Sequence, residues 1–428
     1  MTVYEEFDWR GMVYDGTDGV PELLAREAVT CYIGFDPTAS SLHVGSLLPI
    51  MALARLQRFG HTPIAIVGGG TGLIGDPSGK SQERTLLSRD EVGHNLEGIR
   101  SQLARFLDFD AAANRAHIVN NAEWLDELSF MEFLRDVGKH FTVNYLLAKE
   151  SVKRRLESED GISFTEFSYL MLQAYDFLML YDRYKCRLQL GGSDQWGNIV
   201  AGCDLIRKLR SVQAFGLVLP LVTTASGTKF GKTEAGTIWL DPNRTSPYQF
   251  YQFWLNVDDR DAITYLKYFT FLSREEIGAL EAATARAPEK RDAQRRLAQE
   301  VTTLVHGQDA VERAEQGTKL LFDKNMTKLT FESIRAVIRD VPSFTVPVSQ
   351  LTGDGLALVE LLSSAGVTSS KGEATRLIRS GGIYLNNERV SDERLRLKRD
   401  QAIDGRLFLI RKGTKQNFLI EISDKPTA

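Results

Sequence analysis

The chain has 428 residues, a length typical of about three domains. Its composition is 43% hydrophobic and 25% charged, which is ordinary for a globular protein with a sizeable core. No apolar run reaches the roughly 18 residues of a membrane span, and residues 1–10 lack the apolar core of a signal peptide. These features argue against a membrane partner and favour a cytoplasmic protein. Cys31, Cys186 and Cys203 are too few and too scattered for a disulfide framework or a zinc site, so we expect reduced thiols and no metal ligands.

Charge is distributed unevenly along the chain. The formal net charge is −4, yet residues 371–415 hold 12 Lys and Arg against 6 Asp and Glu, an excess of +6 that leaves −10 for the remainder. This pattern indicates a basic module attached to an acidic body, as in proteins that bind nucleic acid. A solvated charged surface is the simpler alternative for the same residues.

Short apolar strands alternate with longer helical segments over the first half of the chain. The strands are expected at residues 32–35, 64–67, 117–119, 188–190 and 217–219. This rhythm predicts an α/β domain over residues 1–233, with a doubly wound parallel sheet and helices on both faces. Ligands of such sheets lie at the carboxyl ends of the strands, so polar motifs that follow the strands should converge on one crevice.

The second half of the chain has a different pattern. Residues 234–321 predict an α-helical domain, including the charged amphipathic stretch 289–306. Pro342, Pro347 and weak periodicity place a linker at residues 322–350. Residues 351–428 combine helical patterns at 356–364 and 373–380 with short strands near 383–385 and 407–410, which predicts a small α+β domain.

Two short segments have the residues of a nucleotide site. The first is Gly34-Phe35-Asp36-Pro37-Thr38-Ala39-Ser40-Ser41-Leu42-His43-Val44-Gly45-Ser46, which leaves a strand and enters a helix whose first turn carries His43 and Gly45. Backbone N–H groups at a helix start favour phosphate, and the missing Cβ of Gly45 lets a base or ribose lie close to the backbone. The second is Lys229-Phe230-Gly231-Lys232-Thr233, whose two lysines can neutralise a triphosphate. Together the segments predict a site for a nucleoside triphosphate.

The order of these segments points to one family. The chain lacks the Gly-x-Gly-x-x-Gly of dinucleotide-binding folds and the spacing of a P-loop. The pair instead resembles the HIGH and KMSKS signatures of class I aminoacyl-tRNA synthetases. Three further segments narrow the resemblance to bacterial tyrosyl-tRNA synthetases: Gly68-Gly69-Gly70-Thr71-Gly72-Leu73-Ile74-Gly75-Asp76-Pro77-Ser78-Gly79-Lys80, residues 169–176, and Gly191-Gly192-Ser193-Asp194-Gln195-Trp196-Gly197-Asn198.

The resemblance covers essentially the whole chain and implies its architecture. It implies a Rossmann-like catalytic domain, then the helical domain on the side of the tRNA anticodon, then an S4-like RNA-binding domain. The last is carried by Ser370-Lys371-Gly372-Glu373-Ala374-Thr375-Arg376-Leu377-Ile378 and Gly382-Ile383-Tyr384-Leu385-Asn386. Within it we expect RNA contacts from Lys371, Arg376 and Arg379.

A predicted helix over residues 165–181 is apolar on nearly every face except at Tyr169, Gln173 and Asp176. These fall at i, i+4 and i+7 and so stack along one side, where an internal hydrogen-bond network is one interpretation. The resemblance implies a pocket for tyrosine instead, with Tyr32 and Asp176 at its phenol. The implied pocket residues are Tyr32, Asp36, Asp76, Tyr169, Gln173, Asp176 and Gln195.

The resemblance also implies the residues that act on ATP. Those expected to bind it are Gly34, His43, Gly45, Ser46, Gly192, Asp194 and Lys232. Those expected to act on the phosphates during catalysis are Thr38, His43, Lys80, Arg84, Lys229, Lys232 and Thr233. For Asp194 the alternative is a cap of the following helix, and for Lys80 and Arg84 it is an ordinary surface charge.

The implied reaction joins L-tyrosine to tRNA(Tyr) through tyrosyl-adenylate, with Mg²⁺ accompanying ATP. A homodimer is expected from the resemblance alone. The chain departs from the family pattern at Ser46, which replaces the second signature histidine, at Ile33, where some relatives have a cysteine, and at Pro49 in the first helix. We expect these departures to affect the affinity for ATP and the rate of the reaction, but not the class of reaction.

Three alternatives remain on the sequence alone. Another nucleotidyl-transferring enzyme would explain the signatures but not the polar face of Tyr169, Gln173 and Asp176. The sister synthetase for tryptophan would need a single acceptor for its indole. A non-catalytic RNA-binding protein on a synthetase scaffold should have lost phosphate ligands such as His43 and Lys232, which this chain keeps.

Overall fold

The computed structural model describes residues 1–76, 78, 87–157, 161–227, 230–233, 236–322, 330–331, 343–413 and 416–424, with the backbone alone at 151, 232, 233 and 320–322. The chain divides into two compact units. One comprises Met1–Thr245 and Phe253–Val305, and the other Ser246–Gln252 and His306–Ala428. Lys80, Arg84 and Lys229 lie outside the described residues. No helix in the described part of the chain is long and apolar enough to cross a membrane.

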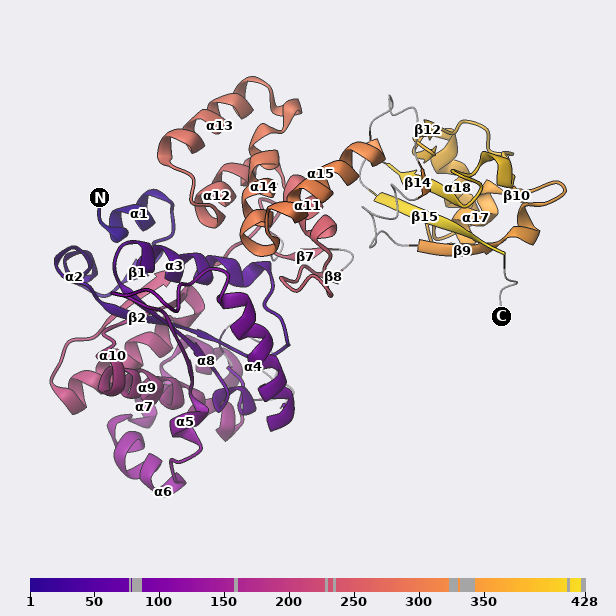
Figure 1. Cartoon of the computed structure of the whole chain (residues 1–428). Coiled ribbons are helices and arrows are strands. Elements are labelled where there is room, and N and C mark those ends of the chain that lie inside the picture. The colour runs from indigo at the N-terminus through magenta and orange to yellow at the C-terminus, as the bar shows by residue number, and fades with distance from the viewer. Residues whose placement is uncertain are drawn as a thin grey trace. The chain divides into compact units, whose positions relative to one another are not determined.

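A six-stranded sheet forms the centre of the first unit, in the order β1-β6-β5-β2-β3-β4 (Figure 1). Its strands are β1 (Asp15–Gly16), β2 (Thr30–Phe35), β3 (Thr62–Val67), β4 (His117–Asn120), β5 (Leu188–Gly192) and β6 (Phe215–Leu219). All pairs are parallel except β1 with β6. The predicted α/β fold with five parallel strands is confirmed. The edge strand β1 was not predicted, because its two residues carry no apolar pattern.

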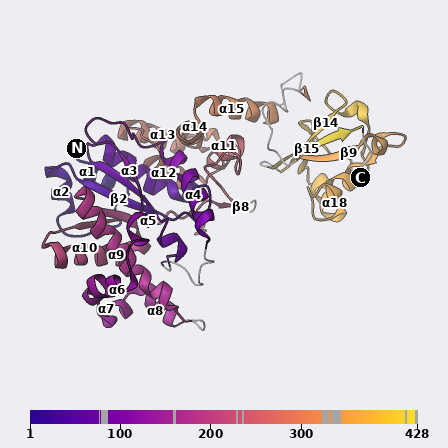
Figure 2. The same ribbon diagram turned by 60° about the horizontal axis from the view of Figure 1, so that its bottom comes forward.

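Helices cover both faces of this sheet, with α3 on one side and α9 and α10 on the other (Figures 1 and 2). The helices of residues 1–210 are α1 (Val3–Trp9), α2 (Val20–Arg26), α3 (Leu47–Arg58), α4 (Arg89–Leu103), α5 (Ala122–Leu125), α6 (Phe130–Glu132), α7 (Val143–Leu147), α8 (Glu150–Leu156), α9 (Phe164–Tyr184) and α10 (Trp196–Arg210). The long helix α9 begins at Ser163, whose side chain caps the backbone N–H of Glu166. Its apolar face joins Tyr32, Ile64 and Phe177 in one buried cluster, as the continuous apolar run predicted.

A short hairpin and a helical region follow the sheet. The hairpin pairs β7 (Lys232–Thr233) with β8 (Gly236–Thr237). The expectation that no strand follows Thr233 in this region is therefore wrong. The helices are α11 (Pro247–Leu255), α12 (Asp259–Phe269), α13 (Arg274–Arg286), α14 (Asp292–His306) and α15 (Gln308–Phe322). The helical character predicted for most of residues 234–321 is thus observed, while the domain boundaries remain a prediction.

The C-terminal residues contain a five-stranded sheet in the order β12-β11-β14-β15-β9. Its strands, together with the separate pair β10 and β13, are β9 (Ser343–Pro347), β10 (Leu356–Ala357), β11 (Ile383–Leu385), β12 (Glu388–Arg389), β13 (Arg396–Leu397), β14 (Leu407–Lys412) and β15 (Gln416–Ser423). The helices are α17 (Leu358–Ser364) and α18 (Lys371–Arg379).

Strand β9 corrects one expectation, because it lies inside the predicted linker and pairs in parallel with β15. Pro342 and Pro347 suggested a turn, but proline is compatible with an edge strand such as β9. A second correction concerns residues 356–357, which pair with β13 rather than opening the predicted helix. Only the part of the linker before Ser343 remains a linker prediction.

Candidate active site

The first signature segment forms the turn between β2 and α3. His43 is the N-cap of a short 3₁₀ turn, Val44–Ser46, and its Nδ1 accepts the backbone N–H of Gly45 at 3.0 Å. The histidine therefore lies just before the helix rather than in its first turn, and Nε2 is left as the ring's donor. A Cβ at Gly45 would lie 2.7 Å from Cε1 of His43. Glycine is required there because the imidazole folds back over it.

A cavity of about 310 Å³ opens beside this turn. It is lined by Gly34, Phe35, Asp36, Thr38, Ser41, Leu42, His43, Gly45, Ser46, Pro49 and Trp239. Six residues predicted to contact substrates therefore share one cavity. Trp239 was not predicted; it follows β8, and its ring lies 6.2 Å from that of His43. Pro49 occupies the first turn of α3, where its missing N–H is harmless.

The second signature segment contacts the first. The backbone N–H of Val44 donates to the carbonyl of Ile238 at 3.0 Å, and that of Ile238 donates to the carbonyl of Gly231 at 3.1 Å. Gly231 has φ +80°, and a Cβ there would lie 2.6 Å from Cγ2 of Val44. The structure thus brings the two predicted signatures together. Of Lys232 and Thr233 it describes only the backbone, in β7.

Polar side chains from three segments form a hydrogen-bonded network near the ends of β3 and β5. Asp76 accepts from Nε2 of Gln195 at 2.7 Å and from the backbone N–H of Ser78 at 2.8 Å. Gln173 on α9 donates to Oε1 of Gln195 at 3.2 Å and accepts from Asn198 at 2.9 Å. Three of the residues predicted to bind tyrosine are therefore joined directly. Asn198 was not predicted, although it follows the same strand as Gln195.

Tyr32 and Asp176 occupy the buried side of this region, at 1% and 4% exposure. The Tyr32 hydroxyl has no hydrogen-bond partner among the described residues. Asp176 accepts from Trp124 Nε1 at 2.7 Å and from Asn121 Nδ2 at 2.9 Å. An unpartnered buried hydroxyl costs about 1–3 kcal/mol, so a polar ligand group that reached it would stabilise this site.

Burial controls the protonation of this pair. Desolvation raises the pKa of Asp176 to about 7, although the hydrogen bonds from Asn121 and Trp124 lower it. Desolvation also raises the pKa of Tyr32, and the Asp176 charge adds to that effect. Asn121 and Trp124 were not predicted from the sequence. Asn121 follows β4 directly, so the rule that polar residues after parallel strands line the crevice would have identified it.

Asp194 lies in a 3₁₀ turn, Ser193–Gln195, after β5. A Cβ at Gly192 would lie 2.6 Å from its Oδ1, so glycine is needed at that position. The N-cap of α10 is Gln195, with no capping bond from a side chain. Asp194 is therefore not the N-cap residue of α10, and its role in binding stays a prediction.

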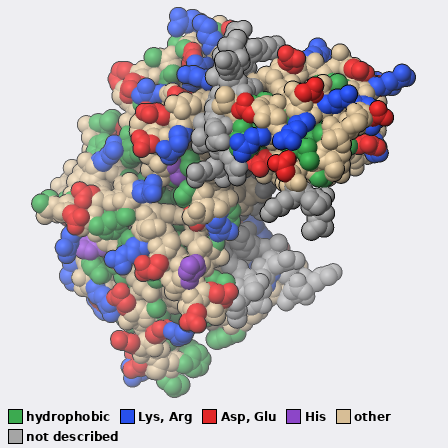
Figure 3. All heavy atoms as spheres, turned by 45° about the vertical axis from the view of Figure 1, so that its right-hand side comes forward, with side chains coloured by type: hydrophobic (Ala, Val, Ile, Leu, Met, Phe, Trp, Pro, Cys, Tyr) green, Lys and Arg blue, Asp and Glu red, His purple; other side chains and the backbone are tan. Residues whose placement is uncertain are grey.

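The three residues predicted to bind RNA lie on α18 and are exposed. Lys371 pairs with Glu360 at 2.7 Å and Arg379 with Glu393 at 2.7 Å. On the face of the molecule in Figure 3, basic and acidic side chains are likewise interspersed. Ion pairs at the surface are weak, so these basic side chains can leave their carboxylate partners to contact a phosphate. Arg411, which was not predicted, lies 3.6 Å from the ring centre of Tyr384.

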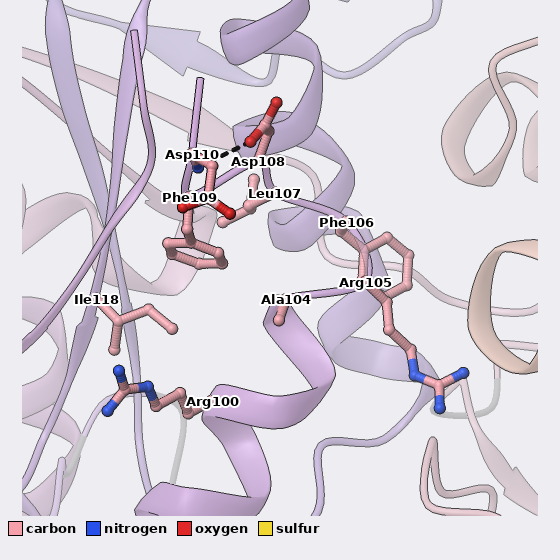
Figure 4. A pocket seen from close by; sticks show the side chains of 9 residues that line it. All are labelled: Arg100, Ala104, Arg105, Phe106, Leu107, Asp108, Phe109, Asp110 and Ile118. Carbon is pink, nitrogen blue, oxygen red and sulfur yellow. Dashed lines mark hydrogen bonds between the residues drawn. The ribbon is translucent and has the colours of Figure 1, made fainter. Parts of the chain in front are cut away.

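A second cavity, of about 720 Å³, lies between the end of α4 and β4 (Figure 4). Figure 4 shows Asp108 and Asp110 at one end of it and Arg100 at the other, with Phe109 and Ile118 between them. None of the predicted site residues lines it. Its charged side chains are exposed and of both signs, so no buried polar group is available in it to bind a ligand.

The sheet, the turn at its crevice and the two touching signatures define a class of protein. A family profile described as tRNA synthetases class I (W and Y) matches residues 24–323, and one described as the tyrosine–tRNA ligase SYY-like C-terminal domain matches residues 333–420. The chain is therefore a class I aminoacyl-tRNA synthetase, and so an enzyme. It belongs to the tyrosyl-tRNA synthetase family, as the sequence resemblance predicted.

Individual relatives agree with this placement. The chain is 57% identical over 421 residues to the tyrosine–tRNA ligase of Roseiflexus castenholzii, covering 98% of this chain and 99% of that one. It is 56% identical over 423 residues to that of Geobacillus stearothermophilus, with the same coverage. Among solved structures, a C-terminally truncated mitochondrial tyrosyl-tRNA synthetase of Aspergillus nidulans has 31% identity and a TM-score of 0.69, covering 75% of this chain and 94% of that one.

Proposed function

We propose that this chain activates L-tyrosine with ATP, forming tyrosyl-adenylate and pyrophosphate, and then transfers the tyrosyl group to the 3′ end of tRNA(Tyr). The observation that best supports tyrosine as the substrate is the buried hydroxyl of Tyr32, which has no partner among the described residues, beside the buried carboxylate of Asp176. A phenol can donate to the carboxylate and accept from the Tyr32 hydroxyl. Phenylalanine would leave the Tyr32 hydroxyl without a partner and would donate nothing to Asp176. Tyrosyl-tRNA synthetases are themselves the standard example of rejection by this means.

The same geometry separates tyrosine from tryptophan. An indole N–H is a donor only, so it cannot donate to Asp176 and also accept from the Tyr32 hydroxyl as a phenol can. Asp76, Gln173 and Gln195 form the network next to this site, and Tyr169 precedes Gln173 by one turn of α9. Carboxylate and amide oxygens are suitable acceptors for the tyrosine ammonium group. We assign Asp76, Tyr169 and Gln173 to that group, and Asp36 and Gln195 to the carboxylate end.

Activation needs alignment more than proton transfer. The tyrosine carboxylate is ionised at neutral pH and attacks the α-phosphorus of ATP without a general base. Rate enhancement then comes from positioning and from stabilising the charge that moves onto the phosphates. Thr38 and His43 line the cavity at the first signature and are assigned to phosphate. We assign Lys80, Arg84, Lys229 and Lys232 as cations and Thr233 as a hydroxyl donor, on family membership.

The cavity at the first signature is assigned to ATP. Gly34, Gly45 and Ser46 contribute to its lining, and the serine hydroxyl replaces the second signature imidazole. Gly192 and Asp194 follow β5 and are assigned to the ribose. Mg²⁺ is proposed to accompany ATP as part of the substrate, held mainly by phosphate oxygens and water. The described residues contain no group of three or more His, Cys, Asp or Glu that could hold a metal ion.

The C-terminal domain is proposed to bind tRNA, through Lys371, Arg376 and Arg379 among others. Phe331 belongs with this domain, because its N–H donates to Asp404 at 2.6 Å and Arg406 lies over its ring at 3.8 Å. A chain ending at residue 325 therefore removes the domain without cutting β9. It should form tyrosyl-adenylate normally but lose tRNA charging and the salt dependence of tRNA binding. Normal charging by the shortened chain would contradict this role.

We also propose that the chain acts as a homodimer in the cytoplasm. Seven of the eleven exposed large apolar side chains of the described residues fall between residues 130 and 164: Phe130, Met131, Leu134, Val143, Leu147, Leu156 and Phe164. Such a concentration is typical of an interface. The three cysteines are free thiols, which is compatible with a reducing compartment.

Charging of tRNA(Tyr) tests the function directly. We expect the enzyme to attach labelled tyrosine to this tRNA and to leave labelled phenylalanine and tryptophan in solution. Lys232→Ala should slow adenylate formation while leaving tyrosine affinity unchanged, as for a transition-state contact. Equal losses in rate and affinity would contradict the role of Lys232. Charging of the tRNA with tryptophan would contradict the assignment of tyrosine as the substrate.

A further inference from the structure

The second signature contains one aromatic residue, Phe230, and its side chain is buried at 5% exposure. It contacts a cluster of rings contributed by α11 and α12. The ring centres lie 5.0 Å from Tyr265, 5.5 Å from Phe269, 5.6 Å from Phe253 and 5.7 Å from Trp254, and the rings of Phe230 and Phe269 are nearly parallel, at 9°. The segment assigned to the phosphates is therefore anchored in a core outside the sheet.

The next residue is held from the other side. Gly231 packs against Val44 so closely that a Cβ would lie 2.6 Å from Cγ2 of Val44. Two consecutive residues are thus fixed, one by the end of α12 and one by the first signature. Lys232 follows directly, in β7. Its starting position is set by these two contacts.

The first signature is tied to the same end of α12. Helix α3 begins next to Ser46, and its Arg55 is 1% exposed. The Arg55 guanidinium donates to the carbonyls of Tyr268 at 3.0 Å, Lys267 at 3.1 Å and Thr270. These are carbonyls at the C-terminus of α12, which lack partners within the helix and favour a cation.

A second guanidinium strengthens this attachment. Arg10 donates to the carbonyls of Lys267 at 2.9 Å and Leu272 at 2.7 Å, and it pairs with Glu6. Hydrogen-bonded buried polar groups favour a single geometry, and of the donors on these two guanidinium groups only Nε of Arg55 is buried without a partner among the described residues. The end of α12 is therefore a rigid support with Phe269 on one side and the guanidinium of Arg55 on the other.

We infer that residues 265–270 are a shared support for both signature segments, and that Phe230 is a positioning residue for the reaction. Phe230 lies in the ring cluster and does not line the cavity at the first signature; it acts by fixing the backbone of Lys232 relative to His43. Arg55 does the same for the helix that follows His43. This inference rests on the phosphate role proposed for Lys232.

Phe230→Ala and Phe230→Leu test the positioning role in pyrophosphate exchange. A misplacement of about 1 Å can cost on the order of a hundredfold in rate. We expect kcat to fall by about ten- to a hundredfold in Phe230→Ala and by less in Phe230→Leu, with KM for tyrosine changed by less than about twofold. Phe215→Leu is the matched control, because Phe215 is a buried ring of β6 beside Gly19 and Arg187. It should keep kcat.

Two results would overturn the inference. One is an unchanged kcat in folded Phe230→Ala, or in Phe230→Leu where the alanine variant does not fold. The other is a parallel loss in Phe215→Leu, which would indicate a general effect of lost core packing. Lys232→Ala is measured alongside. If it retains full kcat, the role proposed for the lysine has failed instead of the positioning role.

The shared support is tested by combining Phe230→Leu with Arg55→Lys. Substitutions that act through one structural element do not have additive effects. We expect the fold-loss of kcat in the double variant to be smaller, by a factor of at least about three, than the product of the fold-losses in the two single variants. A loss equal to the product would overturn the shared support.

Discussion

Gly231 packs directly against Val44, with a φ of +80° and space for no side chain between them. This contact joins two segments that lie far apart in the chain and places the backbone of one signature on the other. The carbonyl of Gly231 also accepts from Ile238, whose own carbonyl accepts from Val44. Two backbone hydrogen bonds and this close packing therefore hold the two signature segments together.

Gly231→Ala is predicted to impair adenylate formation. Alanine would be strained at a positive φ and would meet Cγ2 of Val44 at 2.6 Å. We expect kcat for pyrophosphate exchange to fall by about tenfold or more, because the segment must move to relieve the clash. Gly227→Ala is the matched control, since Gly227 has φ +78° and nothing within 4 Å of its Cβ position. Similar losses in both variants would assign the effect to φ strain alone.

Trp124→Phe is predicted to weaken tyrosine binding. The change removes the donor at 2.7 Å from Asp176 and leaves only Asn121 to hold that carboxylate. Hydrogen bonds to charged groups contribute about 1.5–3 kcal/mol, so tyrosine affinity should fall by about ten- to a hundredfold. Equilibrium dialysis measures the change, with Trp9→Phe on α1 as the control. Tyrosine affinity within about twofold of the parent would show that Trp124 does not orient Asp176.

Discrimination between tyrosine and phenylalanine is predicted to depend on pH. The pKa of Asp176 is raised to about 7 by burial, so the carboxylate is ionised above pH 7 and protonated below it. The ionised form is the better acceptor for a phenol. The ratio of tyrosine to phenylalanine affinity should therefore fall as the pH is lowered from about 8 to about 6. Phenylalanine is the internal control, since it shares the ammonium and carboxylate groups. A constant ratio would contradict a titrating Asp176 at the phenol.

Met131→Glu is predicted to dissociate the proposed homodimer. Met131 is 72% exposed and is one of the seven exposed apolar side chains of residues 130–164, and a carboxylate there would have to be desolvated in an interface. Light scattering should give twice the 47.9 kDa chain mass for the parent and the single-chain mass for the variant. Tyr14→Glu is the control, because Tyr14 is similarly exposed, at 66%, outside that segment. A variant that keeps the parent mass would place the interface elsewhere.

Periodicity was sufficient to predict the main sheet. Residues 32–35 and 64–67 are apolar on both faces, and buried parallel strands require this pattern. The two-residue strand β1 and the edge strand β9 were missed because their pairing depends on partners distant in sequence, β6 and β15. Pro347 made the second case harder, since proline suggests a turn unless the strand lies at an edge.

The family motifs predicted Tyr32, Gln173 and Asp176 as residues of the tyrosine pocket. The structure buries or hydrogen-bonds each of them, and their contact with tyrosine stays a prediction. Trp124 and Trp239 were missed because they lie outside the quoted motifs, and Asn198 was missed although it ends one of them. Lys80, Arg84 and Lys229 lie outside the described residues, so their roles remain predictions from the sequence.

The central claim is that this site activates tyrosine alone. ATP–pyrophosphate exchange, measured with each of the twenty amino acids supplied singly, tests it most directly. We predict exchange with tyrosine and none above background with phenylalanine or tryptophan. Exchange with another amino acid would contradict the assignment of Tyr32 and Asp176 to the phenol. No exchange with any amino acid, from folded protein, would contradict activation itself and favour a scaffold that only binds RNA.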